Sequence, residues 1–421
     1  MTNSRMLAVL AGASLVFVAC GTTGTSGTTS KGTIKIGVEL PESGKEASNG
    51  LPTLNGVKYY VQTHSTIKGF TIEVENLDDA VNGVHDPSKG AQNMQTLVAD
   101  AKVLGVVGPF NSGVAKAEIP VANQASLVMV SPANTNECLT QDFPAPECTF
   151  KPADLRPTGN NNYFRVAATD NRQGPALADY AVKTLGLKNV CVADDGETYG
   201  QGIANNFKKE LVAKGAALAD YKDYTDIKNT NDFKPFWAKC VQAHADGVYF
   251  GGTDSNKVCI ARQQMKAAGL NVPFMGGDGI VTSQCITDAA DNVDNMYGTV
   301  AAVDATQVGS AKSVITGFKT AFTAASDFGA YTIPAYDCAG VILDAISRAI
   351  DAANGNMPTR AQVRTALAAT KAFGGALGTF GFDANGDTTL PVITIYKVGA
   401  APGLTGSTPK DWVYADQVTF S

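Results

Sequence analysis

Short apolar runs alternate along the chain with longer segments in which apolar and polar residues are mixed. Residues 103–108 read V-L-G-V-V-G, an unbroken apolar run that suits a strand buried on both faces. Residues 115–125 predict a helix, and residues 127–130 predict a second buried strand. The order strand, helix, strand indicates a βαβ unit and therefore a parallel sheet.

The same alternation covers most of the remaining chain. We expect further strands at 34–40, 70–77, 190–193, 247–250 and 392–398. We expect further helices at 54–64, 87–101, 172–185, 203–214, 232–243, 257–268, 311–325, 335–353 and 360–368. A long polar loop at 141–162 separates two α/β series, which predicts two lobes joined by several crossovers.

Polar turns of small residues follow both strands of the βαβ unit. They are P-F-N-S-G at 109–113 and S-P-A-N-T-N at 131–136. Ligands of open α/β sheets bind at the carboxyl ends of the strands, and a helix N-terminus favours negative charge. One hypothesis is that Ser112 and Thr135 bind an anionic group of a small solute. The alternative is that Ser112 only caps its helix and that 131–136 is only a turn.

The N-terminus has the features of an export segment. Arg5 precedes an apolar stretch that ends before Cys20, and this stretch is too short to span a membrane. Residues 17–20, F-V-A-C, resemble a bacterial lipobox, with Phe17 where the motif usually has Leu. We therefore expect a signal peptide at 1–19 and a lipidated Cys20 that begins a Gly/Ser/Thr tether at 20–32. The globular body would then be held outside the cytoplasmic membrane.

Cysteine usage agrees with export. The chain has eight cysteines, and lipidation of Cys20 leaves seven for an oxidising compartment that favours disulfides. There is no C-x-x-C, which disfavours a zinc or redox motif. The expected pairs are Cys138–Cys148, Cys191–Cys240 and Cys259–Cys285, which leaves Cys338 as a free thiol.

Composition and motifs disfavour nucleic-acid binding and enzymatic chemistry. The 33 basic and 39 acidic residues give a net charge of −6 and form no basic run. Neither G-x-G-x-x-G nor G-x-S-x-G occurs, and the histidines at 64, 85 and 244 lie outside the candidate turns. Residues 383–387 mimic part of a calcium loop but lack its glutamate, so we expect a turn. We expect no enzyme, no cofactor and no metal.

Six short motifs, in this order, give the chain a resemblance to a known family. They are V-V-G-P-F-N-S, S-P-A-N-T-N, D-G-E-T-Y-G-Q-G, V-Y-F-G-G, F-M-G-G-D-G and F-D-A-N-G-D. Together with the lipobox they resemble the substrate-binding lipoproteins of ABC importers for branched-chain amino acids, the Leu/Ile/Val-binding family. The resemblance runs from Thr33 to about Val398.

The resemblance implies the type I periplasmic-binding-protein fold. This fold is α/β, with two doubly wound parallel-sheet lobes joined by a hinge of several crossovers. Lobe I would comprise 33–160 and 302–388, and lobe II 161–301 and 389–421. The lobes of such proteins close on a solute like a hinge, and the solute then passes to an ABC permease and its ATPase.

The resemblance also implies roles for particular residues. Ser112 and Thr135 would bind the α-carboxylate of an amino acid, and the carbonyl of Ala133 would accept from its ammonium group. Tyr199 would close over the ligand from lobe II, and Asp278 would pair with the ammonium. An ordinary tyrosine at a helix start and an ordinary turn aspartate are the alternatives for these last two residues. Asn111 is a further candidate because it precedes Ser112.

Two positions depart from the family pattern. Asn49 stands where the family often has a tyrosine, and Thr253 replaces an aromatic residue after the G-G of V-Y-F-G-G. Both changes predict a thinner aromatic wall that accepts a more polar solute. We therefore expect a monomeric binding protein for a branched-chain amino acid or a related small zwitterion. The alternative is a sensor that presents another small solute, such as an amide, a urea-like compound or a carboxylic acid, to a receptor or kinase.

Overall fold

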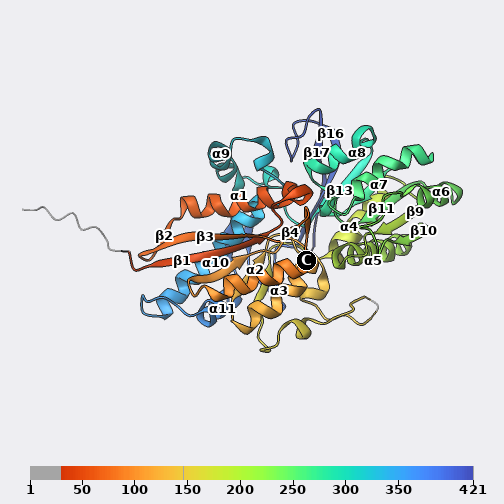
Figure 1. The fold of residues 1–421 in the computed structure, drawn as a ribbon. Helices are drawn as coiled ribbons and strands as arrows, with labels where there is room; N and C mark the ends of the chain where they lie inside the picture. The colour runs from red at the N-terminus through yellow and green to blue at the C-terminus, as the bar shows by residue number, and fades with distance from the viewer. Residues whose placement is uncertain (1–29, 146, 421) are drawn as a thin grey trace, which may run out of the picture.

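The computed structural model describes residues 30–145 and 147–420, and these form an α/β fold with two large sheets. Figure 1 shows the sheets in two lobes that lie side by side. The predicted signal peptide and Cys20 lie outside the described residues. No helix of the described residues is long and apolar enough to cross a membrane.

The first sheet carries the expected βαβ unit. Its parallel strands, in order across the sheet, are β3 (Phe70–Asp78), β1 (Thr33–Leu40), β6 (Val103–Val107), β7 (Val128–Ser131) and β8 (Tyr163–Arg165). The short β2 (Thr66–Ile67) adds antiparallel to β3. Every residue of β6 and β7 is buried, as their unbroken apolar runs predict. The helices of this lobe are α1 (Ala47–Thr63), α2 (Pro87–Ala99), α3 (Ser112–Gln124), α9 (Ala311–Ala321), α10 (Thr332–Ala352) and α11 (Arg360–Ala368).

The second sheet has five parallel strands and an antiparallel edge. The parallel strands, in order, are β10 (Ala217–Asp223), β9 (Asn189–Asp194), β11 (Gly247–Gly251), β12 (Phe274–Gly276) and β13 (Met296–Val300). The edge is the hairpin of β16 (Val392–Ala400) and β17 (Lys410–Thr419). The helices of this lobe are α4 (Asp170–Lys183), α5 (Thr198–Ala213), α6 (Lys234–Gln242), α7 (Val258–Met265) and α8 (Ser283–Ala289).

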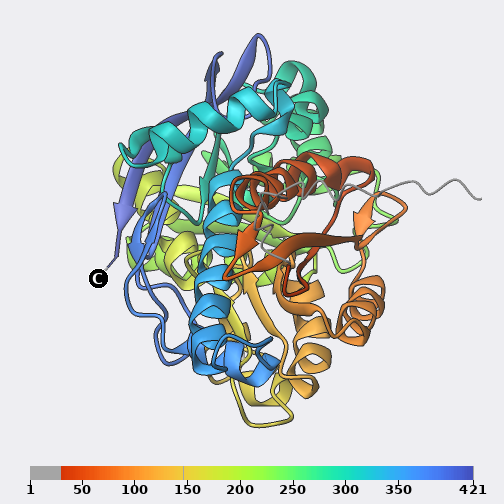
Figure 2. The ribbon, with the colours of Figure 1, turned by 90° about the vertical axis from the view of Figure 1, so that its left-hand side faces the viewer.

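The chain passes between the sheets after β8, after β13 and before β16. Figure 2 shows α10, which follows the second passage, running beside α1 through the middle of that view. β8 belongs to the first sheet, so the boundary expected at 160/161 falls a few residues too early. The reason is that β8 pairs with β7, and the polar loop that precedes it does not end the first lobe.

The expected helices and strands are present, with ends that shift by a few residues. The apolar pattern did not indicate β2, β8, β10, β12, β13 and β17, nor the small hairpin of β14 (Phe373–Gly375) and β15 (Gly378–Phe380). β10 has no fully buried residue, which explains the missing signal. The sulfurs of the three expected cysteine pairs form disulfides, and Cys338 is free and buried in α10.

Candidate functional site

The two turns of the βαβ unit meet at the carboxyl edge of the first sheet. Helix α3 begins at Ser112, and its N-cap is Asn111, so the alternative that Ser112 is the cap is wrong. The Ser112 hydroxyl accepts a hydrogen bond from the Asn136 N–H at 3.3 Å, which ties the two turns together. Ala133 and Thr135 are buried in the second turn, and the Thr135 hydroxyl has no partner among the described residues.

Asp278 lies just after β12 in the second lobe and is buried. Its Oδ1 accepts hydrogen bonds from the Tyr199 hydroxyl at 2.9 Å and from Gln173 Nε2 at 2.8 Å. Its Oδ2 accepts one from the Tyr331 hydroxyl at 2.9 Å. Tyr331 precedes α10, a helix of the first lobe, so this carboxylate links the two lobes.

Burial and charge shift the pKa values of these groups. Burial raises the pKa of Asp278, although the three donors partly oppose this rise. Burial also raises the pKa of Tyr199 and Tyr331, and the nearby charge of Asp278 adds to both shifts. Both tyrosines therefore stay protonated and can donate to the carboxylate.

Further hydrogen bonds hold the lobes closed. Asn136 Nδ2 donates to the carbonyl of Thr198 at 3.0 Å, and Asn206 Nδ2 donates to Glu137 Oε1 at 2.7 Å. Lys45, before α1, forms an ion pair with Asp288 of α8. The structure is therefore a closed form.

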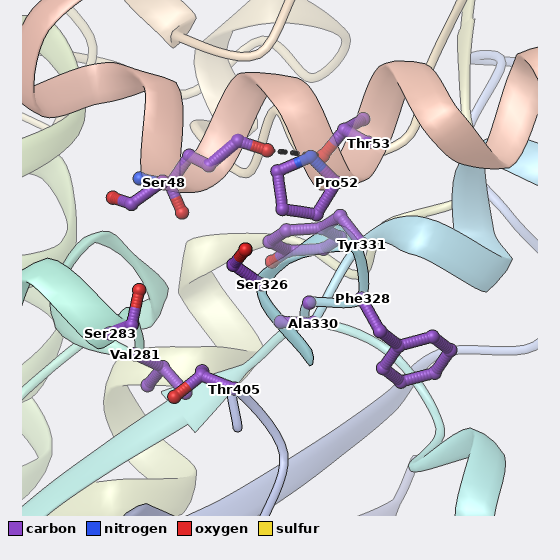
Figure 3. A pocket seen from close by; sticks show the side chains of 12 residues that line it. Ser48, Pro52, Thr53, Val281, Ser283, Ser326, Phe328, Ala330, Tyr331 and Thr405 are labelled. Atoms are coloured by element: carbon purple, nitrogen blue, oxygen red, sulfur yellow. Dashed lines mark hydrogen bonds between the residues drawn. The ribbon is translucent and has the colours of Figure 1, made fainter. Parts of the chain in front are cut away.

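A small cavity of about 10 Å³ remains between the lobes, which is room for about one water molecule. Figure 3 shows Ser48, Pro52 and Thr53 of α1 on one side and Val281, Ser283 and Thr405 on the other, with Tyr331 beneath Pro52. Asn49 lines this cavity too. Because Tyr331 lines the cavity and also donates to Asp278, the cavity adjoins the site.

Polar side chains surround the remaining predicted position, Thr253. Its hydroxyl lies 2.8 Å from the Ser255 hydroxyl, and its N–H donates to Asp195 Oδ2 at 3.2 Å. Glu46, before α1, accepts from Asn111 Nδ2 at 3.1 Å. The side chains around Thr253 and Asn111 are thus polar, and we call them the polar wall.

One group of potential metal ligands occurs among the described residues, formed by Asp254, Cys259 and Cys285. The two cysteines form a disulfide with each other, so neither offers a thiolate. This group does not make a metal site.

The apolar pattern did not single out four residues of the closed site: Glu46, Asp170, Gln173 and Tyr331. Asp170 and Gln173 lie in the first turn of α4, directly after the chain leaves the first sheet. That position is a signal, because it repeats the order of strand, polar turn and helix seen at Ser112. Tyr331 had no comparable signal, since it reaches the site only through the packing of α10.

The chain matches a family model described as periplasmic binding protein over residues 33–401. It is 30% identical, over 374 residues, to Leu/Ile/Val-binding protein homolog 2 of Brucella abortus. The match covers 88% of this chain and 92% of the relative. Leu/Ile/Val-binding protein homolog 3 of Brucella melitensis is 29% identical over 367 residues, or 86% of this chain and 91% of the relative.

Solved structures show the same fold. The leucine-binding protein LivK of Thermotoga maritima superposes with a TM-score of 0.76 at 23% identity, over 92% of this chain and 99% of that protein. A solute-binding protein of R. palustris in complex with 4-hydroxybenzoate superposes with a TM-score of 0.73 at 20% identity, over 92% of this chain and 97% of that protein. Proteins of this fold therefore hold both amino acids and aromatic acids.

Proposed function

The chain belongs to the periplasmic binding protein family, and on that premise we propose that it captures an amino acid between its lobes and delivers it to an ABC permease. It is a solute-binding protein and not an enzyme. The proposal rests on two groups of residues with different chemistry, one in each lobe: hydrogen-bond donors in the first lobe and a carboxylate in the second. Ser112 begins α3 and Thr135 is buried in the turn after β7, while Asp278 of the second lobe accepts a hydrogen bond from Tyr331, which precedes α10 of the first lobe. We propose that these groups form the two poles of the ligand site.

These poles suit a zwitterion. Hydroxyls and the N-terminus of α3 favour a carboxylate, while Asp278 and the carbonyl of Ala133 favour an ammonium. A charged solute that loses its water must find matched partners, because an unmatched buried charge is costly. An amino acid would meet both requirements in one site.

We propose that capture requires the lobes to open, since Ser112, Thr135 and Asp278 are buried in the closed form and the cavity beside them is too small for an amino acid. We propose that the solute first binds to the turns of the first lobe and that closure then brings Tyr199 and Asp278 over it. The three passages of the chain between the sheets supply the hinge. A ligand favours closure only through contacts that are better in the closed form.

The N-terminal sequence supports a location for the protein outside the cytoplasmic membrane. A signal peptide at 1–19 and a lipidated Cys20 would hold the body at the outer face of the cytoplasmic membrane, where a monomer could dock on its permease. Docking of the closed form would complete delivery.

A thermal-shift screen of residues 31–421 tests the proposal. The panel contains leucine, isoleucine, valine, asparagine and short carboxylic acids without an amine. A ligand at a hundredfold excess over its Kd stabilises the folded state by about 2.7 kcal/mol, which raises the melting temperature. We expect a shift with at least one amino acid. A shift with none of the compounds would contradict the proposal.

The polar wall supports one alternative ligand. Asn49 and Thr253 stand where aromatic side chains would enclose an aliphatic group, and a relative of the same fold holds 4-hydroxybenzoate. A shift with carboxylic acids and with no amino acid would favour a binding protein or sensor for such an acid.

A further inference from the structure

One segment of the first lobe reaches across to helix α5 of the second lobe. It follows β7 and contains Asn136, the short helix η2 (Glu137–Leu139) and, further along the same loop, Glu147 and Cys148. Figure 1 shows this loop, in yellow, passing below α5. Its contacts with α5 join protein to protein, so they act on the position of the lobes.

Two hydrogen bonds join the start of this segment to α5. Asn136 Nδ2 donates to the carbonyl of Thr198 at 3.0 Å, and Asn206 Nδ2 donates to Glu137 Oε1 at 2.7 Å. Gly202 lies between Thr198 and Asn206 along the helix, and a methyl group built on it would lie only 2.4 Å from Asn136 Nδ2. The glycine therefore leaves room for the asparagine amide to reach the helix.

A third contact extends the same row along α5. Lys209 Nζ lies 3.3 Å from Glu147 Oε2 and forms an ion pair with it. The four α5 positions in contact with the segment are 198, 202, 206 and 209, and positions three or four apart share one face of a helix. The segment therefore runs along a single face of α5.

A disulfide ties the two parts of this segment into one unit. Cys138 follows Glu137, Cys148 follows Glu147, and the two cysteines are bonded to each other. Each carboxylate that contacts α5 therefore lies directly beside one of the bonded cysteines. Burial raises the pKa of Glu137, Asn206 opposes this rise, and the charge of Glu147 adds to it. In the closed form, α5 brings an amide and an ammonium group to this acidic pair.

We propose that this disulfide-tied segment is a clamp that stabilises the closed form and so strengthens the binding of any ligand enclosed between the lobes. The clamp consists of residues 136–138 and 147–148. Its disulfide lies within the first lobe, so the clamp keeps its shape when the lobes separate and need not be ordered again at each closure. Contacts made only in the closed form add to the apparent affinity. The proposal rests on the opening and closing of the lobes in the proposed function.

The test combines a measurement without ligand and one with ligand. Small-angle X-ray scattering of the ligand-free protein gives its radius of gyration, and calorimetric titration with leucine, valine and asparagine gives affinities. Three variants weaken the clamp: Asn206→Ala, Lys209→Met, and Cys138→Ser combined with Cys148→Ser. Each variant is checked for a cooperative thermal transition, and Asn206→Ala tests the proposal alone if the cysteine double variant does not fold.

Two control variants remove matched interactions that lie within the second lobe. Lys183→Met breaks an exposed ion pair with Asp179 of the same helix, at 2.8 Å. Its lysine is 64% exposed, close to the 73% of Lys209. Cys191→Ala combined with Cys240→Ala removes the disulfide between β9 and α6. Neither control touches a contact between the lobes.

We expect Asn206→Ala to weaken amino-acid binding by about 2- to 10-fold, the range of one hydrogen bond. The cysteine double variant should weaken it more, because closure must then order a loosened segment. Lys209→Met should weaken it by at most about fivefold, since an exposed ion pair contributes little. Without ligand, Asn206→Ala and the double variant should have a larger radius of gyration than the wild type. The controls should change neither quantity.

Two results would overturn the clamp while the proposed function stands. In the first, Asn206→Ala and the cysteine double variant bind amino acids as the wild type does. In the second, the control variants weaken binding as much as the clamp variants do, so the effect is a general loss of stability. If the wild type binds none of the amino acids, the proposed function fails and scattering decides alone: a larger radius of gyration in the clamp variants supports the clamp, and an unchanged radius overturns it.

Discussion

Asp387 and Asp170 are both buried where the lobes meet, and their surroundings are opposite. Asp387 accepts hydrogen bonds from Arg165 Nε at 2.7 Å, Gln141 Nε2 at 2.7 Å and the Thr140 hydroxyl at 2.8 Å. Asp170 has no donor at hydrogen-bond distance among the described residues, and the nearby Thr135 hydroxyl only partly offsets the effect of burial on its pKa. Burial alone would raise both pKa values, but Arg165 and its neighbours bring the pKa of Asp387 below its usual value, whereas that of Asp170 is raised.

The difference separates two uses of buried charge. The Asp387 network joins β8, the turn after β7 and the turn before β16. It therefore holds together segments on both sides of two passages between the sheets. The Asp170 region leaves acceptors free at the interface between the lobes. Paired buried charges stabilise the structure, whereas a buried carboxyl without donors is costly and leaves hydrogen-bonding capacity unused.

The largest expected effect comes from breaking the matched region. Arg165 is fully buried and also donates to the carbonyl of Asn136 at 2.7 Å. Arg165→Met would leave Asp387 buried and unpaired, so we expect a loss of about 3–5 kcal/mol in unfolding free energy. Urea unfolding measures this loss.

Lys410→Met is the matched control for this prediction. It breaks the ion pair with Asp294, whose side chains are 40% and 70% exposed, and exposed pairs contribute about 0–1 kcal/mol. Equal losses in the two variants would show that the Asp387 network is not special.

A second prediction concerns His85, which forms a buried ion pair with Glu46. His85 Nδ1 lies 3.6 Å from Glu46 Oε2, and both side chains are buried. Burial would lower the pKa of His85, but Glu46, Glu197 and Asp79 raise it to about 9. A folded-state pKa above the unfolded value of about 6.5 gives stability that is complete below pH 6.5 and is lost as the pH rises through 9.

This shift corresponds to a loss on the order of 3 kcal/mol across that range. Urea unfolding at pH 6.5, 7.5 and 9.5 should show it for the wild type. His85→Gln should lose less stability over the same range, with the remaining loss due to buried carboxyls such as Asp254, whose pKa burial raises to about 8. If both proteins lose stability alike, another group is responsible.

The third prediction uses three tyrosines as an internal comparison. Tyr199 and Tyr331 donate to Asp278, whereas the buried hydroxyl of Tyr249 has no partner among the described residues. Tyr199→Phe and Tyr331→Phe should each cost about 1.5–3 kcal/mol, the range for a hydrogen bond to a charged group. Tyr249→Phe should be neutral or slightly stabilising. Thermal unfolding without ligand distinguishes them, and an equal cost for all three would contradict the matched role of Asp278.

Much of this arrangement was predictable from the sequence. The unbroken apolar runs at β6 and β7 and the polar turns after them place Ser112 and Thr135 at one sheet edge, as expected. The six motifs indicated the fold and the class of protein. Pairs distant in sequence were less accessible, because no local pattern relates Arg165 to Asp387 or Tyr331 to Asp278. Asp170 was missed because an acidic residue in the first turn of a helix is ordinary, and its burial at the interface between the lobes is a tertiary feature.

The smallest expected effect is a gain in stability on replacing Asp170. It tests the contrast between Asp170 and Asp387 at Asp170 itself. Asp170→Asn replaces an unmatched carboxyl by a neutral amide of the same shape, so the ligand-free protein should be more stable by about 1 kcal/mol. Asp387→Asn, which removes a matched charge, should be less stable. Thermal unfolding of both variants without ligand measures the contrast. If Asp170→Asn lost stability as Asp387→Asn does, Asp170 would stabilise the structure as Asp387 does. A gain would instead show that the ligand-free protein carries an unmatched carboxyl at Asp170 at a cost in stability.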